Sequence, residues 1–222
     1  MKIASFIISY SSLFVIATVG AFGSASSPSS SLMHLRADVT PPIYKRSLQQ
    51  LIPILDDFDN SRTLKAFECF DRMTSVVEEI VPNSLRDNES FLQDVKDMMI
   101  TTSSMATEKD ELVVRLALMR GQKCPKWHED YVKIRLLKAY YGDGPEYALP
   151  DDNLVRLNNA LNSLQGKDLA VHPSKVKKCG VNDILIIRGK KSTEEGFIPV
   201  LHRSPAASDE KQRRLLLTIT IP

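Results

Sequence analysis

Histidine is the commonest metal ligand among side chains, and this sequence has four, at His34, His128, His172 and His202. No two of them stand at zinc-ligand spacing, so the sequence predicts no metal site. It also contains no phosphate-binding glycine loop and no nucleophile elbow. We therefore predict that the protein is not an enzyme, and we expect no cofactor and no catalytic residues. An unrecognised enzyme would have to draw its acid or base from scattered residues such as His128 and Glu129.

A second metal pattern lies in an acidic segment. Asp57, Asp59, Ser61 and Glu68 fall at positions 1, 3, 5 and 12 of a calcium loop. Position 6 is Arg62, however, where the turn of such a loop needs glycine. We interpret the segment as the acidic end of one helix followed by the cap of the next.

The charge of the chain is nearly balanced, with 29 Lys and Arg against 27 Asp and Glu. General nucleic-acid binding needs a strong basic excess, so we predict no specific nucleic-acid partner. Local basic clusters indicate weak contact with an acidic surface. The main cluster consists of Lys175, Lys177, Lys178, Arg188, Lys190 and Lys191, and a shorter one of Lys211, Arg213 and Arg214.

The first residues, 1–24, have the pattern of a cleavable signal peptide. Lys2 precedes an apolar run, and the small residues Gly23 and Ala25 suit a cleavage site. Residues 25–43 are rich in Ser and Pro, which predicts a flexible linker. We therefore expect the protein to be secreted.

Two covalent modifications follow from secretion. An oxidising route favours one disulfide among three cysteines. We predict a bridge between Cys124 and Cys179, which lie in loops, and a buried thiol at Cys69 on a helical stripe. Asn88 begins an Asn-Glu-Ser sequon and is the predicted glycosylation site.

Helical spacing dominates the middle of the chain. Apolar residues recur every three or four positions in segments near 44–58, 64–80, 88–99, 112–119, 127–141 and 154–164. We expect these stripes to share one core that contains Phe67, Phe70, Trp127, Ile134, Leu157 and Leu161. Short β-type runs appear only at 181–187, 197–201 and 217–221. The sequence thus predicts a mostly α fold. A helical bundle or orthogonal helical array would form in residues 44–165, and a small β-containing segment in residues 166–222.

One short motif suggests a family. Arg46-Ser47-Leu48-Gln49 resembles the Arg-x-Leu-Arg motif of oomycete secreted effectors, with Gln49 in place of the final Arg. The order of leader, linker, motif and helices also matches that family. The resemblance implies a non-enzymatic virulence effector that binds a host protein and modulates immunity or cell death in the host cytoplasm or nucleus. Extended to Gln50, the motif also resembles the Arg-x-Leu-x-Gln export element of malaria parasites.

Two other functions stay open. The first is an extracellular helical protein that carries a small apolar ligand among Phe91, Met98, Met99 and Met119. The second is a secreted enzyme of a class that no motif identifies.

Overall fold

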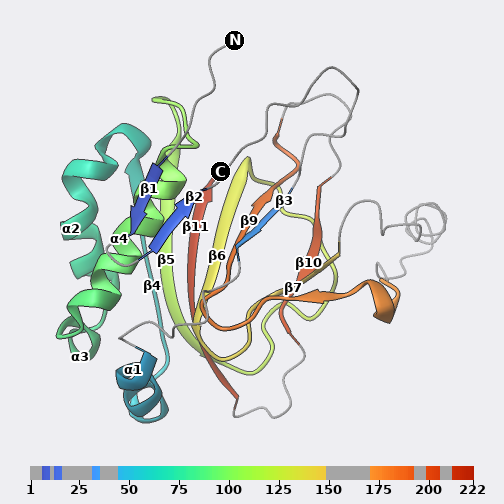
Figure 1. Cartoon of the computed structure of the whole chain (residues 1–222), viewed down its shortest axis with the longest axis horizontal. Coiled ribbons are helices and arrows are strands. Elements are labelled where there is room, and N and C mark those ends of the chain that lie inside the picture. The colour runs from blue at the N-terminus through green and yellow to red at the C-terminus, as the bar shows by residue number, and fades with distance from the viewer. Residues whose placement is uncertain are drawn as a thin grey trace.

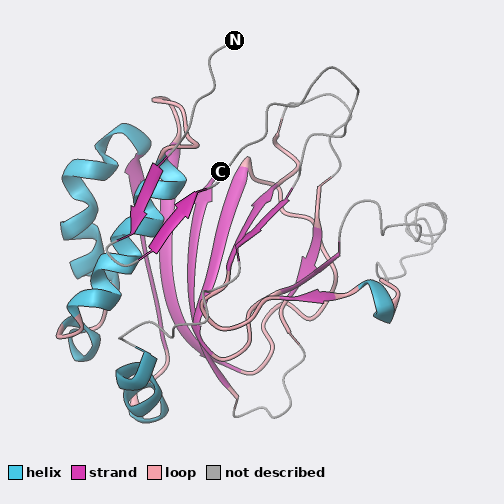
Figure 2. Ribbon diagram, viewed as in Figure 1, coloured by secondary structure: helices cyan, strands magenta, loops and turns pink. Residues whose placement is uncertain are grey.

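The computed structural model describes residues 7–10, 13–16, 32–35, 45–148, 171–192, 199–205 and 212–222. In these residues, helices cover one face of a large antiparallel sheet, and a small sheet lies on its other side (Figure 1, Figure 2). The two sheets therefore form two layers, and the helices form a third layer on the outside of the large sheet.

The large sheet has the strand order β3-β9-β6-β11-β5-β4, and every neighbouring pair is antiparallel. Strand β11 lies between β5 and β6, so the last strand in the sequence is a central strand of the sheet. The bounds are β3 Leu32–Leu35, β4 Phe58–Lys65, β5 Glu111–Arg120, β6 Ile134–Tyr141, β9 Ile184–Arg188 and β11 Arg213–Ile221.

The small sheet has the antiparallel order β10-β7-β8. Its strands are β7 Glu146–Ala148, β8 Lys177–Lys178 and β10 Leu201–Arg203, and the 3-10 turn η4 Pro173–Lys175 precedes β8. A separate antiparallel pair, β1 Ile7–Tyr10 and β2 Leu13–Ile16, lies within the residues for which the sequence predicts a signal peptide.

The helical layer consists of α1 Lys45–Leu51, η1 Ile52–Ile54, η2 Ala66–Glu68, α2 Cys69–Ile80, α3 Asn83–Arg86 and α4 Glu89–Ser103. Asn88 caps α4, because its side chain accepts a hydrogen bond from the backbone N–H of Phe91. Phe91 then packs edge-on against Tyr140 of β6, with ring centroids 4.8 Å apart. No helix in the described parts of the chain is long and apolar enough to cross a membrane.

Strand β11 shows how the large sheet serves two purposes. Leu215, Leu217 and Ile219 point into the core beneath the helices. The alternate residues Arg214 and Leu216, with Thr218 and Thr220, line a cavity on the other face. Because side chains alternate along a strand, one sheet both completes the core and presents a site.

The predicted mostly α fold is wrong. Residues 112–119, expected as a helix, form β5, and the second half of the segment 127–141 forms β6. Both strands are buried on both faces. Apolar residues therefore occur on both faces without alternation, and their spacing imitates a helical stripe.

The predicted core is also partly wrong. Phe67 and Phe70 are 64% and 71% exposed, whereas Trp127 is buried in a small cluster with Ala148 and Leu201. Ile134 packs at the edge of the main core. The stripe at 154–164, with Leu157 and Leu161, lies outside the described residues.

The acidic segment is neither a calcium loop nor a helix end. Asp59 and Ser61 belong to strand β4, and Asp59 accepts two hydrogen bonds from Arg115 of β5, at 2.6 and 2.5 Å.

Candidate metal centre

Two histidines meet between the sheets because two extended segments pair. His128 lies in the segment before β6 and forms an isolated antiparallel bridge with His202 of β10. The backbone N–H of each residue donates to the carbonyl of the other at 3.0 Å. The rings consequently lie together, with centroids 4.4 Å apart.

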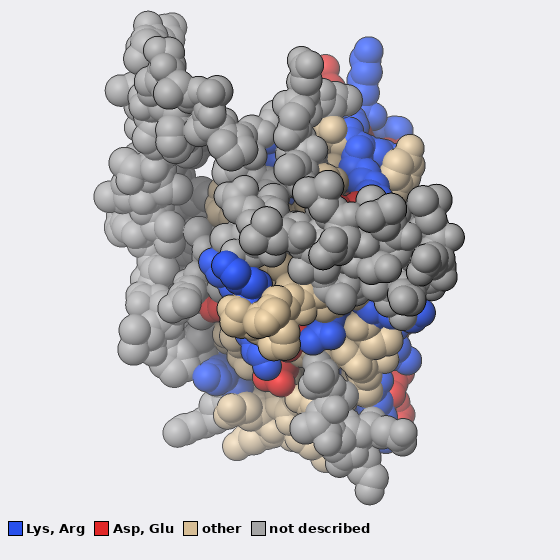
Figure 3. Space-filling view, turned by 90° about the vertical axis from the view of Figure 1, so that its right-hand side faces the viewer, with Lys and Arg blue, Asp and Glu red and all other residues tan. Residues whose placement is uncertain are grey.

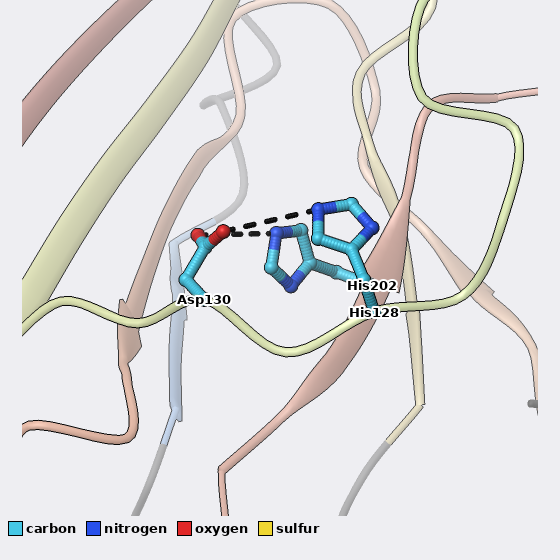
Figure 4. Close-up of side chains that lie close together, drawn as sticks. All are labelled: His128, Asp130 and His202. Carbon is cyan, nitrogen blue, oxygen red and sulfur yellow. Dashed lines mark ion pairs between the residues drawn. The ribbon is translucent and has the colours of Figure 1, made fainter. Parts of the chain in front are cut away.

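Asp130 completes a cluster with the two histidines (Figure 4). Asp130 Oδ1 lies 3.8 Å from His128 Nε2, and Oδ2 lies 3.2 Å from His202 Nε2. One ligand atom from each residue lies within 4.8 Å of the others. Metal–ligand bonds of about 2.0–2.2 Å allow a shared ion between such atoms after small side-chain rotations.

Hydrogen bonds orient both rings for metal binding. His128 Nδ1 lies 2.9 Å from the carbonyl oxygen of Lys126, and His202 Nδ1 lies 3.4 Å from that of Val200. A carbonyl only accepts, so in the neutral ring Nδ1 carries the proton. In that tautomer each Nε2 would offer its lone pair to an ion placed between the rings and the carboxylate.

Asp130 is a buried carboxylate, 8% exposed. Burial alone would raise its pKa, but contact with His202, followed by the charges of Arg135 and His128, outweighs burial and lowers the pKa below the usual range. Oδ2 forms ion pairs with Arg135 and His202, whereas Oδ1 lies 3.8 Å from His128 Nε2. A buried carboxylate that faces two imidazoles fits a site built for a cation.

Arg135 of β6 holds this carboxylate from the side. Its Nη1 lies 2.8 Å from Asp130 Oδ2, while its Nε donates to Thr220 Oγ1 of β11 at 3.1 Å. The guanidinium therefore fixes Asp130 relative to the large sheet.

The backbone around Asp130 rests on the end of β9. Lys190 N–H donates to the carbonyl of Asp130 at 2.8 Å, and Lys191 N–H to that of Val132 at 3.1 Å. A Cβ on Gly189 would lie 2.7 Å from the Asp130 carbonyl oxygen and 2.4 Å from that of Val132. Only glycine allows this close approach.

A cavity of about 830 Å³ opens beside the cluster, and His128 and His202 both line it. Arg214 also lines this cavity and is 7% exposed. Its Nη2 donates to Ser204 Oγ at 3.1 Å, but its Nε has no partner and no carboxylate within the described residues forms an ion pair with it. Burial lowers the pKa of this guanidinium. An unpaired buried cation in a cavity fits the binding of an anion.

The predicted cysteine pairing does not form in the structure. All three cysteines are free thiols, with Cys69 and Cys179 buried and Cys124 exposed. Cys179 lies in the core between the sheets, whereas Cys124 lines the cavity.

The other predicted sites lie away from the cluster. Arg46–Gln49 falls in α1, where Leu48 is fully buried. Asn88 donates its side-chain N–H to Ser47 Oγ. No contact joins either segment to the metal ligands within the described residues.

The predicted basic cluster is divided by the fold. Lys178 pairs with Glu146 at 3.3 Å and Lys190 with Glu129 at 2.9 Å, while Lys191 lies over the ring of Tyr131. Lys175 and Lys177 lie on η4 and β8, and Arg188 ends β9. Lys and Arg side chains occupy several separate parts of the face that carries the small sheet (Figure 3).

Residues 42–219 match a family model described as a protein of unknown function, DUF1826. The chain belongs to the DUF1826 family. Among curated proteins, none matches its sequence.

Solved structures similar to this DUF1826 chain include a full-length Neurospora crassa protein in complex with alpha-KG and 5-formyluracil. This match has 9% identity, covers 86% of this chain and 74% of that one, and has a TM-score of 0.40. The Fe(II)/(alpha)ketoglutarate-dependent dioxygenase TqaL has 11% identity, coverage of 86% and 81%, and a TM-score of 0.45. Iron-bound HygX from Streptomyces hygroscopicus has 8% identity, coverage of 86% and 82%, and a TM-score of 0.42.

The predictions of no enzyme and of a non-enzymatic effector are wrong for this DUF1826 chain. The structure brings His128, Asp130 and His202 into one cluster beside a cavity, with Asp130 and His202 buried and His128 partly exposed. The sequence signal was the His-x-Asp spacing, which puts two ligands on the same side of an extended segment. His202 is distant in the sequence and joins them only through strand pairing.

Proposed function

We propose that the chain is a non-haem Fe(II)-dependent oxygenase with α-ketoglutarate (2-oxoglutarate) as co-substrate. The observation that carries this proposal is the cluster of His128, Asp130 and His202. Two histidines and one carboxylate on one side of an ion leave coordination positions open for a co-substrate and O₂, which is the ligand set of non-haem iron oxygenases. The redox chemistry of bound iron would let O₂ convert 2-oxoglutarate into succinate and CO₂ and supply one oxygen atom to a substrate.

Arg214 supports a dicarboxylate co-substrate. Ser204 lies two residues after His202, about 7 Å along an extended chain, and its Oγ accepts from Arg214 Nη2. A short dicarboxylate can therefore reach from the metal ligands to this guanidinium. Arg214 would bind the distal carboxylate and orient the 2-oxo acid end toward the histidines.

The cavity also has apolar walls that exclude water. Ala117, Leu137 and Leu216 from three neighbouring strands line it together with Val132. Such walls strengthen the ionic contact of Arg214 and protect a reactive site from side reactions.

The test separates metal binding from co-substrate binding. Anaerobic calorimetry with Co²⁺, and then with 2-oxoglutarate, should show both binding steps in the wild type. Asp130→Ala should lose Co²⁺ binding, while Arg214→Gln should keep it and lose 2-oxoglutarate binding by at least about tenfold. His172→Ala changes an exposed histidine just before η4 and serves as the matched control.

With Fe²⁺ and O₂, the wild type should also form succinate from 2-oxoglutarate. Zinc binding without any affinity for 2-oxoglutarate would contradict the proposal and favour a hydrolytic metal site instead.

A further inference from the structure

The three cysteines differ sharply in their surroundings. Cys69 and Cys179 are 2% and 4% exposed, and burial raises the pKa of both thiols, that of Cys179 to about 12. Cys124 is exposed and lines the cavity that contains the metal ligands. Thiolates are the reactive form of cysteine, so Cys69 and Cys179 should be inert and only Cys124 is open to reaction.

Cys124 is fixed beside Arg214 through Ser204. Ser204 N–H donates to the Cys124 carbonyl at 2.9 Å, and Cys124 N–H donates to Ser204 Oγ at 3.3 Å. The same Oγ accepts from Arg214 Nη2 at 3.1 Å. The backbone of Cys124 and the guanidinium of Arg214 therefore meet at the same hydroxyl, and both residues line the cavity.

Two arginines lie near Cys124. Arg115 and Arg214 line the cavity together with it, and cations beside an exposed thiol are the surroundings in which reactive cysteines are found.

Arg214 independently indicates a ligand at this position. It is 7% exposed, its Nε has no hydrogen bond, and no carboxylate in the described parts of the chain forms an ion pair with it. Within the described residues, no carboxylate neutralises this guanidinium, so the position suits an anionic ligand or a new anionic group on a neighbouring side chain.

We propose that Cys124 is a peroxide-sensitive modification site that controls the Arg214 anion subsite. The thiolate sulfur attacks a peroxide oxygen, so that an S–O bond forms, the O–O bond breaks and hydroxide leaves. Sulfur loses two electrons, the peroxide gains them, and Cys124 becomes a sulfenic acid. Its oxygen bonds to Arg214 and fills the position that the distal carboxylate of the co-substrate would occupy. A thiol reductant reverses the change. The inference rests on the Arg214 subsite of the proposed function but does not involve the metal.

The experiment uses the metal-free full-length chain. Hydrogen peroxide is added with dimedone, a trap for sulfenic acids, and the labelled peptides are identified by mass spectrometry. We expect labelling at Cys124, with Cys69 and Cys179 as unlabelled internal controls. Succinate or 2-oxoglutarate should slow the labelling in the wild type, whereas Arg214→Gln should remove this protection.

Calorimetry then tests the consequence. Peroxide should weaken 2-oxoglutarate binding by at least about tenfold in the wild type, and dithiothreitol should restore it. In Cys124→Ser, the affinity should be the same before and after peroxide. Equal labelling of all three cysteines, or unchanged affinity after oxidation of Cys124, would overturn the inference.

The outcomes separate the two proposals. Protection by dicarboxylates without iron-dependent turnover would support the Cys124 site and reject the oxygenase. Turnover with an unreactive Cys124 would reject only the modification site.

Discussion

Two side chains contact the same oxygen of Asp130 at the candidate metal centre. Arg135 Nη1 and His202 Nε2 both approach Oδ2, at 2.8 and 3.2 Å. A bound ion would take the place of the histidine contact but not of the arginine contact. Arg135 would then hold one oxygen and favour coordination through the other, which keeps ligand positions open for co-substrate.

Arg135→Leu is therefore expected to weaken Co²⁺ binding by roughly 10–100-fold, the usual effect of removing a hydrogen-bond partner from a metal ligand. Removing the positive charge of Arg135 also lessens its electrostatic repulsion of the metal ion. The variant Arg115→Leu removes a positive charge from the same cavity and measures this effect separately. Arg115 lines the same cavity but pairs with Asp59. Calorimetry on both variants decides the matter, and equal affinities would argue against a positioning role for Arg135.

At this scale the sequence is partly informative. His128 and Asp130 are two residues apart, which suits two ligands on one side of an extended chain, but the apolar spacing of the segment predicts a helix instead. His202 could not be joined to them without knowing that its strand pairs with His128. The buried state of Arg214 likewise depends on the order of the sheet.

Among the elements, the turn after β9 decides where the metal ligands lie. Gly189 lies under the carbonyls of Asp130 and Val132, and the next two N–H groups of its turn donate to these carbonyls. This turn thus fixes the position of the segment that carries His128 and Asp130.

Gly189→Ala should displace that segment, because the new Cβ would lie 2.4 and 2.7 Å from backbone oxygens that cannot rotate away. We expect a loss of about 1–3 kcal/mol in the free energy of unfolding together with weaker Co²⁺ binding. Gly180→Ala is the control, since its Cβ would lie 3.5 Å from Asp183 Oδ2 in ordinary contact. Urea unfolding and calorimetry provide the readouts. A Gly189→Ala protein with wild-type metal affinity would show that this turn does not position the metal ligands.

Element type was predictable where local chemistry determines it. The N-cap at Asn88 and the interruption of α1 by Pro53 both follow from single residues. Strand β11 follows from its alternating residues. Strands β5 and β6 did not follow, because their burial on both faces comes from the helices and the small sheet, which are distant in sequence.

At the scale of the whole molecule, Asp110 joins the helical layer through its backbone carbonyl and the segments that flank the sheet through its carboxylate. The Asp110 carbonyl accepts from Ala66 N–H of η2 at 3.0 Å, and its side chain accepts from the N–H and hydroxyl of Thr107 at 2.9 and 2.8 Å. Lys133, just before β6, forms an ion pair with the same carboxylate. Acid that protonates Asp110 therefore acts on the joint between two layers.

The hydrogen bond from Lys133 is the largest of the effects that lower the pKa of Asp110 below its usual range. A lowered pKa means that the folded state binds fewer protons than the unfolded state, so the contribution of Asp110 to stability is fully present above about pH 4. It is lost as the pH falls through the folded-state pKa. Asp110→Asn should therefore be less stable than the wild type at neutral pH, and the difference should close in strong acid.

The exposed Asp56 provides the control, since Asp56→Asn should leave stability nearly unchanged at every pH. The measurement is urea unfolding at several pH values between about 7 and 2. If the difference between Asp110→Asn and the wild type stayed constant over this range, the charge of Asp110 would not contribute, and its role would reduce to the hydrogen bonds that asparagine can also accept.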